Sequence, residues 1–328
     1  MIVTSGCGPR LQDLPSFGFC GSRVEQTNGK VPKLSIGLAV RNGRDVIDRC
    51  VTSILSQDFA DFELIICDNV SDDGTIEILK RYACSDARIK LHRNSVNIGS
   101  HENMKRTLDL SRGALFRFIS ADDWLEPGCL SACVRALDFD PEAVGVTTWF
   151  TLHMPDGTTK PAEFRDVFPT ELAPEQRFAR MLWVCHGAKA LYDPVYGMYR
   201  RQRMLRCHPL RPSERTDWLL TAELALEGRI LNIEQRLANR CFTSTVGIDR
   251  TAFRRRLDPI RGELIRTSPR RLYRQMSAIA ISADLTNAQL RRCQPALLSF
   301  WYKETVRSVR NRLSDAKHRA IRRWKRRQ

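Results

Sequence analysis

The first half of the chain alternates between short, continuously apolar runs and longer segments whose apolar residues recur every three or four positions. The short runs predict strands, because a parallel strand that is buried on both faces needs apolar residues at nearly every position. We predict these strands over residues 33–40, 62–68, 88–94, 114–120 and 143–152. The segments between them have the periodicity of amphipathic helices, over residues 43–57, 71–83, 100–113 and 126–137.

Strand and helix therefore alternate four times, and the connections are short enough to require right-handed crossovers. This pattern predicts an α/β fold with an open, doubly wound, mostly parallel sheet flanked by helices. In such sheets, ligands bind beyond the carboxyl ends of the strands. Candidate functional residues are therefore expected directly after the predicted strands.

The second half of the chain is less regular. Residues 174–184 and 214–228 predict helices, whereas residues 194–200 and 229–234 predict strands. Near the end, residues 302–328 form a basic helix with a narrow apolar stripe. The stripe consists of Val306, Val309, Leu313, Ala316, Ala320 and Trp324.

Charge is distributed unevenly along the chain. The 328 residues include 53 Lys and Arg against 37 Asp and Glu, a formal net charge of +16. Residues 249–328 contain 22 of the basic and 6 of the acidic side chains, so the remainder is neutral. A basic helix with an apolar stripe can lie on an anionic membrane surface, bind nucleic acid, or pack its stripe against the domain. We favour the membrane surface as the partner and nucleic acid least.

Other features narrow the class of protein. No apolar run reaches the roughly 18 residues that a membrane-spanning helix needs. Residues 1–30 lack the pattern of a signal peptide and predict a disordered tail. The 11 cysteines show no C-x-x-C spacing, which favours free thiols in a reducing cytoplasm over a disulfide framework or a zinc site. The sequence contains no zinc-hydrolase, P-loop or dinucleotide fingerprint.

Two adjacent acids, Asp122 and Asp123, follow the predicted strand at 114–120 and come too early to cap the helix expected near Pro127. Like charges side by side are unfavourable unless a cation is present. A Mg²⁺ or Mn²⁺ ion, held by these carboxylates and by substrate phosphates, would remove the repulsion. The structural alternative is an Asx turn with a solvated neighbour.

Two further acids are candidates. Asp68 ends a predicted buried strand, and because Asp72 and Asp73 lie closer to the next helix and can cap it, a functional role is favoured for Asp68. Asp217 lies in the first turn of the predicted helix at 214–228. There it can serve as a general base or simply stabilise the helix dipole.

Three segments together resemble a known family. They are LSIGLAVRNGRDVIDRCVTSILSQDFADFELIICDNVSDDGT, then RNSVNIGSHENMKRTLDLSRGALFRFISADDWLEPGCL, and TDWLLTAELALEGRIL. In order and spacing they resemble family 2 glycosyltransferases. In that family, a first strand and a helix ending in S-I-L-x-Q precede V-D-D-G-S-x-D-G-T, a later strand ends in D-x-D-D, and a Glu-Asp pair opens a helix further on. The resemblance covers residues 33 to about 240.

The resemblance implies a GT-A fold and an inverting, metal-assisted glycosyltransferase of hexosyltransferase type that uses a nucleoside-diphosphate sugar. By position, Asp217 would be the general base, Asp68 would accept a hydrogen bond from the nucleobase, and Asp122 would hold the metal on the donor diphosphate with Asp123 beside it. The residues implied to bind the nucleotide sugar are Arg41, Asn42, Asp68, Asn97, Gly99 and Asp122.

The sequence departs from the family pattern at three positions. Ser120 stands where the first Asp of D-x-D is expected, Asn69 replaces the second acid after the second strand, and Thr216 replaces the Glu before Asp217. These departures leave open a non-catalytic relative that binds nucleotide sugars or glycans. A nucleic-acid-binding protein that acts through the basic tail is the other alternative.

We therefore expect three parts: a disordered tail over 1–30, a GT-A-like domain over 31–245 and a basic helical extension over 246–328. The expected acceptor is a polysaccharide, a lipid-linked glycan or another envelope glycan. The expected location is the cytoplasm, at the inner face of the cell membrane.

Overall fold

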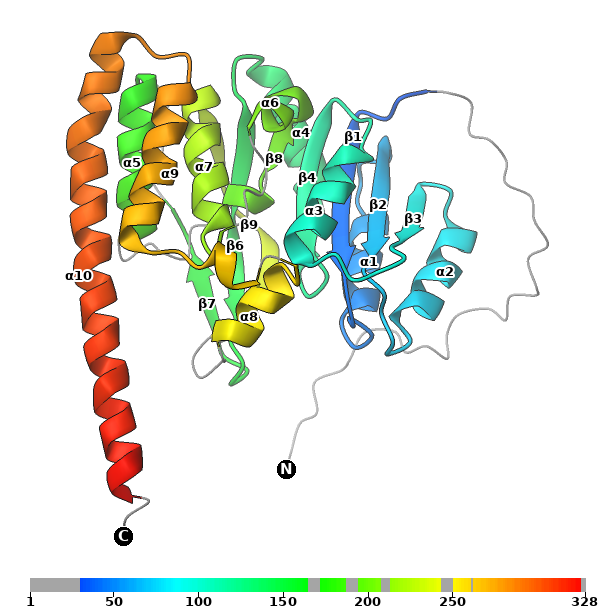
Figure 1. The fold of residues 1–328 in the computed structure, drawn as a ribbon. Coiled ribbons are helices and arrows are strands. Elements are labelled where there is room, and N and C mark those ends of the chain that lie inside the picture. Colours follow the sequence, from blue (N-terminus) through cyan, green and yellow to red (C-terminus); the bar gives the residue numbers. More distant parts are fainter. Residues whose placement is uncertain are drawn as a thin grey trace, which may run out of the picture. The chain divides into compact units, whose positions relative to one another are not determined.

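The computed structural model describes residues 30–164, 172–186, 194–207, 213–242, 250–260 and 262–325. Residues 1–29, where a disordered tail is predicted, lie outside this part. Val31–Gln328 form one compact unit, built on a nine-stranded sheet with the order β3-β2-β1-β4-β8-β6-β9-β5, in which β7 pairs with β6 (Figure 1). The predicted α/β class is confirmed.

The amino-terminal half of the sheet contains four parallel strands, as predicted. They are β1 (Leu34–Val40), β2 (Phe62–Asp68), β3 (Ile89–Arg93) and β4 (Leu115–Ser120). β1 and β2 are almost entirely buried, which explains their continuous apolar sequences. In register, Val40 lies opposite Asp68, and Asp68 lies opposite Arg93. The strands therefore end at one edge, and the polar residues that follow them meet there.

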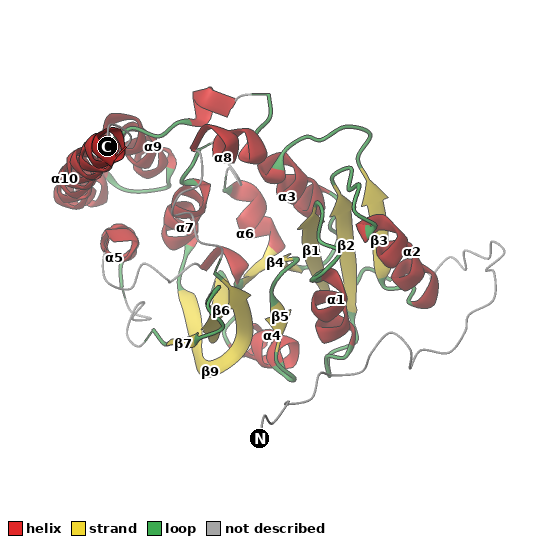
Figure 2. Cartoon of the chain, turned by 90° about the horizontal axis from the view of Figure 1, so that it is seen from below, coloured by secondary structure: helices red, strands yellow, loops and turns green. Residues whose placement is uncertain are grey.

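Helices connect these strands. They are α1 (Ile47–Leu55), α2 (Thr75–Ser85), α3 (Ser100–Asp109) and α4 (Cys129–Phe139). Figure 2 shows α1 and α3 on opposite faces of the parallel strands, as expected for a doubly wound sheet. The helix predicted near Pro127 begins two residues later, because Gly128 adopts a left-handed conformation (φ +80°) as its cap.

The second half of the sheet is mixed. The strands are β5 (Trp124–Leu125), β6 (Gly145–His153), β7 (Thr159–Ala162), β8 (Met198–Arg200) and β9 (Ile230–Cys241). β8 is antiparallel to β4 and β6, whereas β6 and β9 run parallel. β5 follows β4 closely in sequence yet pairs with the distant β9. This half of the sheet therefore curls back toward β4.

Two predictions in this region need correction. The predicted strand over 194–200 begins as a 3-10 turn, Pro194–Tyr196, because the Gly197 N–H donates to Pro194 O. Only Met198–Arg200 is extended. The predicted strand over 229–234 instead continues to Cys241, with a register irregularity opposite Trp149.

Helices cover the remainder of the described chain: α5 (Pro174–His186), α6 (Arg201–Arg206), α7 (Thr216–Glu227), α8 (Arg250–Leu257), α9 (Pro269–Ser282) and α10 (Asn287–Lys325). A short 3-10 turn, Gly262–Ile265, lies between α8 and α9. The region over 246–328 is thus mainly helical where it is described. Figure 1 shows α5, α7, α9 and α10 gathered beside the sheet.

The long helix α10 buries one face. Cys293, Leu297 and Phe300 are almost fully buried and recur every three or four residues, so this face packs on the neighbouring helices. Side chains are described up to Arg310, and the predicted stripe beyond that point lies outside the described side chains. In the part of the chain that the structure describes, no helix is long and apolar enough to cross a membrane.

Candidate active site

The turns that follow β1 and β2 are joined by side chains. Asn42, in a left-handed conformation (φ +55°), donates from Nδ2 to Asp72 Oδ1 (2.8 Å) and accepts the Asp72 N–H (3.1 Å). Its own N–H donates to Ser71 Oγ (2.9 Å), and the Gly43 N–H donates to Thr75 Oγ1. Asn42 therefore shapes this edge of the site, while Arg41 is exposed beside it.

Asp68 is fully buried at the end of β2. Both of its carboxylate oxygens accept the Ser71 N–H at 3.3 Å, and its Oδ2 lies 3.2 Å from Arg93 Nε. Arg93 also donates from Nη2 to Ser71 O (3.0 Å). A single carboxylate thus holds the turn and anchors a half-exposed arginine at the sheet edge.

Val70 lies in the same turn with φ +61°. Positive φ is unfavourable for a β-branched residue and is ordinarily occupied by glycine. The family pattern quoted above has glycine at this position. The turn therefore has the conformation that the family sequence encodes, but here it contains a strained side chain, which sequence reasoning did not identify.

Buried amides fix the loop after β3. Asn69 donates from Nδ2 to Asn97 Oδ1 (2.8 Å) and Gly99 O (3.3 Å), while its Oδ1 accepts from Asn94 Nδ2 (2.9 Å) and the Ile98 N–H (3.0 Å). An aspartate could make only the accepting half of this set. Asn69, which replaces the family's acid, therefore has a structural role, because its amide holds the loop of Asn97 and Gly99.

The same loop is held from the other side by α8. Gly99 has φ +84°, and a Cβ built there would lie 2.5 Å from Leu257 O and 3.0 Å from Asp258 Cα. No side chain fits at this position without displacing backbone. The predicted nucleotide loop is thus fixed between the amide network and the end of α8.

The adjacent acids after β4 have different surroundings. Asp122 is partly exposed, and its Oδ1 accepts from Ser120 Oγ at 2.5 Å. Asp123 is buried, accepts the Cys241 N–H (3.0 Å) and lies 3.5 Å from Arg240 Nε. Asp123 therefore ties β4 to β9, while Asp122 faces the edge where the parallel strands end.

Two neighbours show the electrostatic character of this position. Burial raises the pKa of the Cys50 thiol well above its usual value, and the carboxylates of Asp123 and Asp122 raise it further. Arg49 is stacked 3.6 Å from the centre of the Trp124 ring and donates from Nη2 to Asp122 O (3.2 Å). The negative charge of Asp122 and Asp123 therefore has a cation, Arg49, beside it, which sequence reasoning missed.

The described residues do not form a metal cage. Nowhere among them do three or more His, Cys, Asp or Glu side chains gather in a way that could hold a metal ion. Mg²⁺ commonly uses one or two carboxylates together with water and substrate phosphates. The oxygen ligands of Asp122, with Asp123 beside it, fit that mode of binding.

Asp217 comes from the helical side of the molecule, in the first turn of α7. The start of α7 is anchored, since Glu214 accepts from Arg254 Nη1 (3.0 Å) and from the Thr267 N–H (3.1 Å). Arg254 belongs to α8, the helix that contacts Gly99. Neither Glu214 nor Arg254 was identified from the sequence, where no local pattern marks them as partners.

Comparison with known proteins identifies the family and the fold. The model of the family described as "Glycosyl transferase family 2" matches residues 35–202. The chain is 32% identical over 106 residues to a GalNAc(5)-diNAcBac-PP-undecaprenol beta-1,3-glucosyltransferase of Campylobacter jejuni, covering 32% of this chain and 34% of that protein. The first curated relatives that it matches are covered over only 13 to 38% of their length.

Two groups of solved structures share the fold. S. aureus TarS 1–349 in complex with UDP-GlcNAc aligns with a TM-score of 0.58 and 18% identity, covering 82% of this chain and 73% of that one. Mannosyltransferase PcManGT from Pyrobaculum calidifontis, in complex with GDP-Man and Mn²⁺, aligns with a TM-score of 0.51 and 15% identity, covering 89% and 81%. At these identities the likeness establishes the fold.

Proposed function

The chain belongs to glycosyl transferase family 2, and from that premise we propose that it transfers a sugar from a nucleoside-diphosphate sugar to an acceptor hydroxyl with inversion. The observation that carries the proposal is the shared carboxyl edge of the parallel strands. There the turn at Asp68, the amide-held loop at Gly99 and the acid at Asp122 follow neighbouring strands. This is the position at which such sheets bind ligands.

We assign the nucleotide to the turns after the first three strands. Arg41 is exposed there, Asn42 fixes the first turn, and Asn97 and Gly99 form the loop opposite. Asp68 would accept a hydrogen bond from the base in place of the one from the Ser71 N–H or of its contact with Arg93. The fixed backbone of these turns lowers the ordering cost of binding.

We assign the donor diphosphate to the end of β4. A Mg²⁺ or Mn²⁺ ion there would be held by Asp122, with Asp123 beside it, and when bound would stabilise the negative charge of the leaving diphosphate. Asp123 can contribute an oxygen only if its contact with Arg240 opens. Ser120 supports Asp122 by donating to its carboxylate, which is the use we infer for the hydroxyl at the family's acid position.

Asp217 is proposed as the general base. Inversion requires the acceptor hydroxyl to attack the anomeric carbon on the face opposite the leaving group, with its proton removed by a carboxylate on that side. Asp217 lies on α7, in the half of the molecule across from the nucleotide turns. The buried pair Glu214–Arg254 would position the first turn of α7 for this role.

Nucleoside-diphosphate release from a panel of donors, with Mg²⁺ or Mn²⁺, tests the function. Asp217→Asn is expected to lower turnover by about 10²–10⁴-fold, the usual contribution of a general base, while donor affinity measured by calorimetry stays unchanged. Asp109→Asn is the matched control, because Asp109 is an exposed helical carboxylate paired only with Lys105 in the described structure. If no donor binds with either metal, the chain is a non-catalytic relative.

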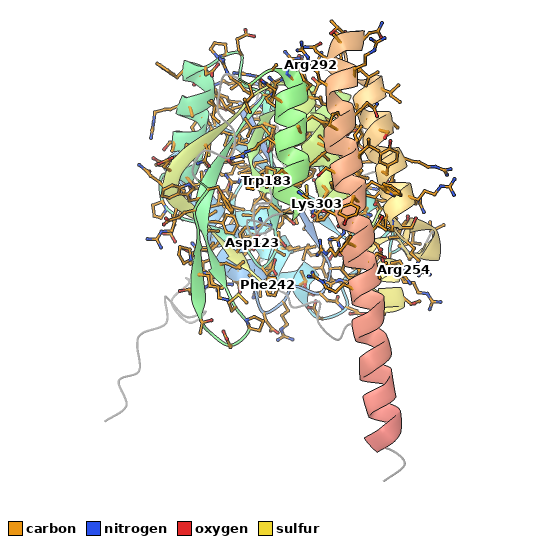
Figure 3. The ribbon with its side chains drawn as sticks, turned by 90° about the vertical axis from the view of Figure 1, so that its left-hand side faces the viewer. Asp123, Trp183, Phe242, Arg254, Arg292 and Lys303 are labelled. Atoms are coloured by element: carbon orange, nitrogen blue, oxygen red, sulfur yellow. The ribbon has the colours of Figure 1, made fainter. Side chains whose placement is uncertain are left out.

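We further propose that α10 rests on an anionic membrane surface at the inner face of the cell membrane and that the acceptor is a glycan or a lipid-linked glycan. On the side of α10 opposite its buried face, four side chains are about half exposed or more: Leu298, Tyr302, Val306 and Val309. Lys303 lies along this helix, as Figure 3 shows. An apolar band flanked by cations fits the headgroup region of a bilayer.

Flotation with vesicles tests the membrane proposal. Binding is expected to phosphatidylglycerol vesicles and to be several-fold weaker to phosphatidylcholine, because the cations contribute about 1 kcal/mol each near an anionic surface. Tyr302→Ser combined with Val306→Ser should weaken binding, whereas Ile281→Ser should not, because Ile281 is equally exposed but belongs to α9. Equal binding of both variants would refute the assignment, and preferential binding to duplex DNA would favour the nucleic-acid alternative.

A further inference from the structure

Arg117 is a buried cation in the middle of an otherwise apolar strand. Its side chain lies in β4, and the residue is only 4% exposed. Nη1 contacts Cys129 Sγ (3.5 Å) and Cys133 Sγ (3.8 Å) on α4, and Nε has no hydrogen-bond partner. Among the residues that the structure describes, no carboxylate pairs with Arg117. The guanidinium therefore uses one of its nitrogens on two weak acceptors.

A buried guanidinium without an anion is strongly unfavourable, because its desolvation is not offset and it does not lose its proton in proteins. The two thiols offer partial compensation. A hydrogen bond from Cys133 lowers the pKa of Cys129 to about 7, and the charge of Arg117 acts in the same direction. Even a Cys129 thiolate would contact only Nη1, so it leaves Nε without an acceptor.

Space adjoins the Arg117 side chain. Two small cavities of about 30 and 20 Å³, partly open to solvent, share Arg117, Tyr196, Ala238 and Arg240 in their walls. Thr148 adds a hydroxyl to the larger cavity. The polar groups thus come from β4, β6 and β9, which the curled half of the sheet brings together.

The second arginine is held in place. Arg240 lies 4.1 Å from the centre of the Tyr196 ring and 5.1 Å from that of Phe150, and its Nε is 3.5 Å from Asp123 Oδ2. Two guanidinium groups therefore line the cavities; Asp123 is a carboxylate partner of Arg240, whereas no carboxylate among the described residues pairs with Arg117. Stacked and paired arginines of this kind are preorganised to bind an oxyanion.

We propose that these two cavities form a second ligand site, which borders Asp123 but lies apart from the nucleotide turns, and that it binds a carboxylate or phosphate group between Arg117 and Arg240. The group would accept from the Arg117 guanidinium and from the Thr148 hydroxyl, while Phe150 and Ala238 contact the apolar part of the ligand. Either a free oxyanion or the acid group of an acidic sugar has this chemistry. The acidic-sugar source rests on the proposed transferase function, whereas the anion site does not.

The test uses the full chain in a zwitterionic buffer and measures the thermal unfolding midpoint with acetate, phosphate, glucuronate, glucose or chloride at equal ionic strength. At about ten times Kd, an oxyanion should raise the midpoint by about 2–4 °C. Arg117→Met should abolish this rise while retaining or raising the midpoint without anion, because it replaces an uncompensated buried charge by an apolar side chain of similar length.

The different added compounds distinguish a free oxyanion from an acidic sugar as the ligand. A rise with acetate or phosphate identifies a free-anion site, and a rise with glucuronate alone identifies an acidic-sugar site; glucose should have no effect. An equal rise in Arg117→Met, an equal rise with chloride, or no rise with any oxyanion overturns the proposal. A rise of the unfolding midpoint with oxyanion that appears only in Cys129→Ala would show that the Cys129 thiolate already neutralises Arg117 in the wild type. That result would also overturn the proposal.

Should Arg117→Met fail to fold, Thr148→Val gives an independent measurement. It removes one hydroxyl from the cavity with little change in shape and should weaken oxyanion binding several-fold by calorimetry. Thr159→Val is its control, because Thr159 is exposed on β7. Unchanged affinity in Thr148→Val, together with unchanged affinity in Arg240→Lys, would place the anion elsewhere.

Discussion

His101 should make the fold sensitive to mild acid. It lies in the first turn of α3, is 8% exposed, and its Nδ1 has no hydrogen-bond partner in the described structure. Burial lowers its pKa to about 4, although the carboxylate of Asp258 acts in the opposite direction. The neutral imidazole is therefore the form that the folded state accepts.

The magnitude follows from linkage. The unfolded chain binds the proton near a pKa of about 6.5, and the folded chain only near about 4. Between these values the unfolded state holds more protons, so stability falls as the pH falls. Between about pH 7.5 and about pH 5 the loss is about 2 kcal/mol, and it levels off at about 3 kcal/mol below pH 4.

Urea denaturation of the wild type and of His101→Gln at about pH 7.5 and about pH 5 measures this pH-dependent loss of stability. The wild type should lose about 2 kcal/mol more than the variant over this interval, because only the wild type has to exclude the proton. Comparing the two differences removes any effect of the substitution on stability that is independent of pH. An equal loss in both proteins would refute the reasoning.

His92→Gln is the matched control. His92 is only partly buried on β3, where burial also lowers its pKa, so its removal should change the pH dependence less. The site offers a second measurement, since His101 directly follows the loop that ends at Gly99 and that loop packs against α8. If this loop binds the nucleotide, donor affinity should stay constant over this pH interval in the wild type and in His101→Gln alike, because the folded chain keeps the imidazole neutral down to about pH 4.

Two substitutions at the sheet edge give further predictions. Val70→Gly should stabilise the protein by about 0.5–1 kcal/mol in urea denaturation, because relief of a left-handed conformation, worth about 1–2 kcal/mol, exceeds the added chain entropy of about 0.5–1 kcal/mol; a loss of stability would contradict the assigned strain. Asn69→Asp should destabilise by about 1–3 kcal/mol, because it removes both donations to the loop. Asn69→Asp should also weaken donor binding, and an unchanged protein would show that the amide network is dispensable.

Local sequence was sufficient for the parallel half of the molecule. Continuous apolar runs marked the strands because both of their faces are buried, and the polar residues after them were placed correctly because parallel strands in register end at one edge. Asp68 ends β2, Asn97 and Gly99 follow β3, and Asp122 follows β4. Two of the three segments that resemble the family lie in this half, and the family is confirmed by the match over residues 35–202, whereas the third segment, at 216–231, lies beyond that match.

The tertiary structure decided which partners these residues have. Asp123 was predicted to share a metal with Asp122, yet in the fold it accepts from Cys241 and contacts Arg240, more than a hundred positions away. In the sequence, Arg117 is simply a polar residue within an apolar strand. Arg240 comes to line the same cavity only because β9 pairs with β5 in the fold. Periodicity encodes whether a position is buried, because burial repeats with the geometry of each element. It does not encode what a buried charge meets, because that depends on chain segments brought together only when the sheet curls.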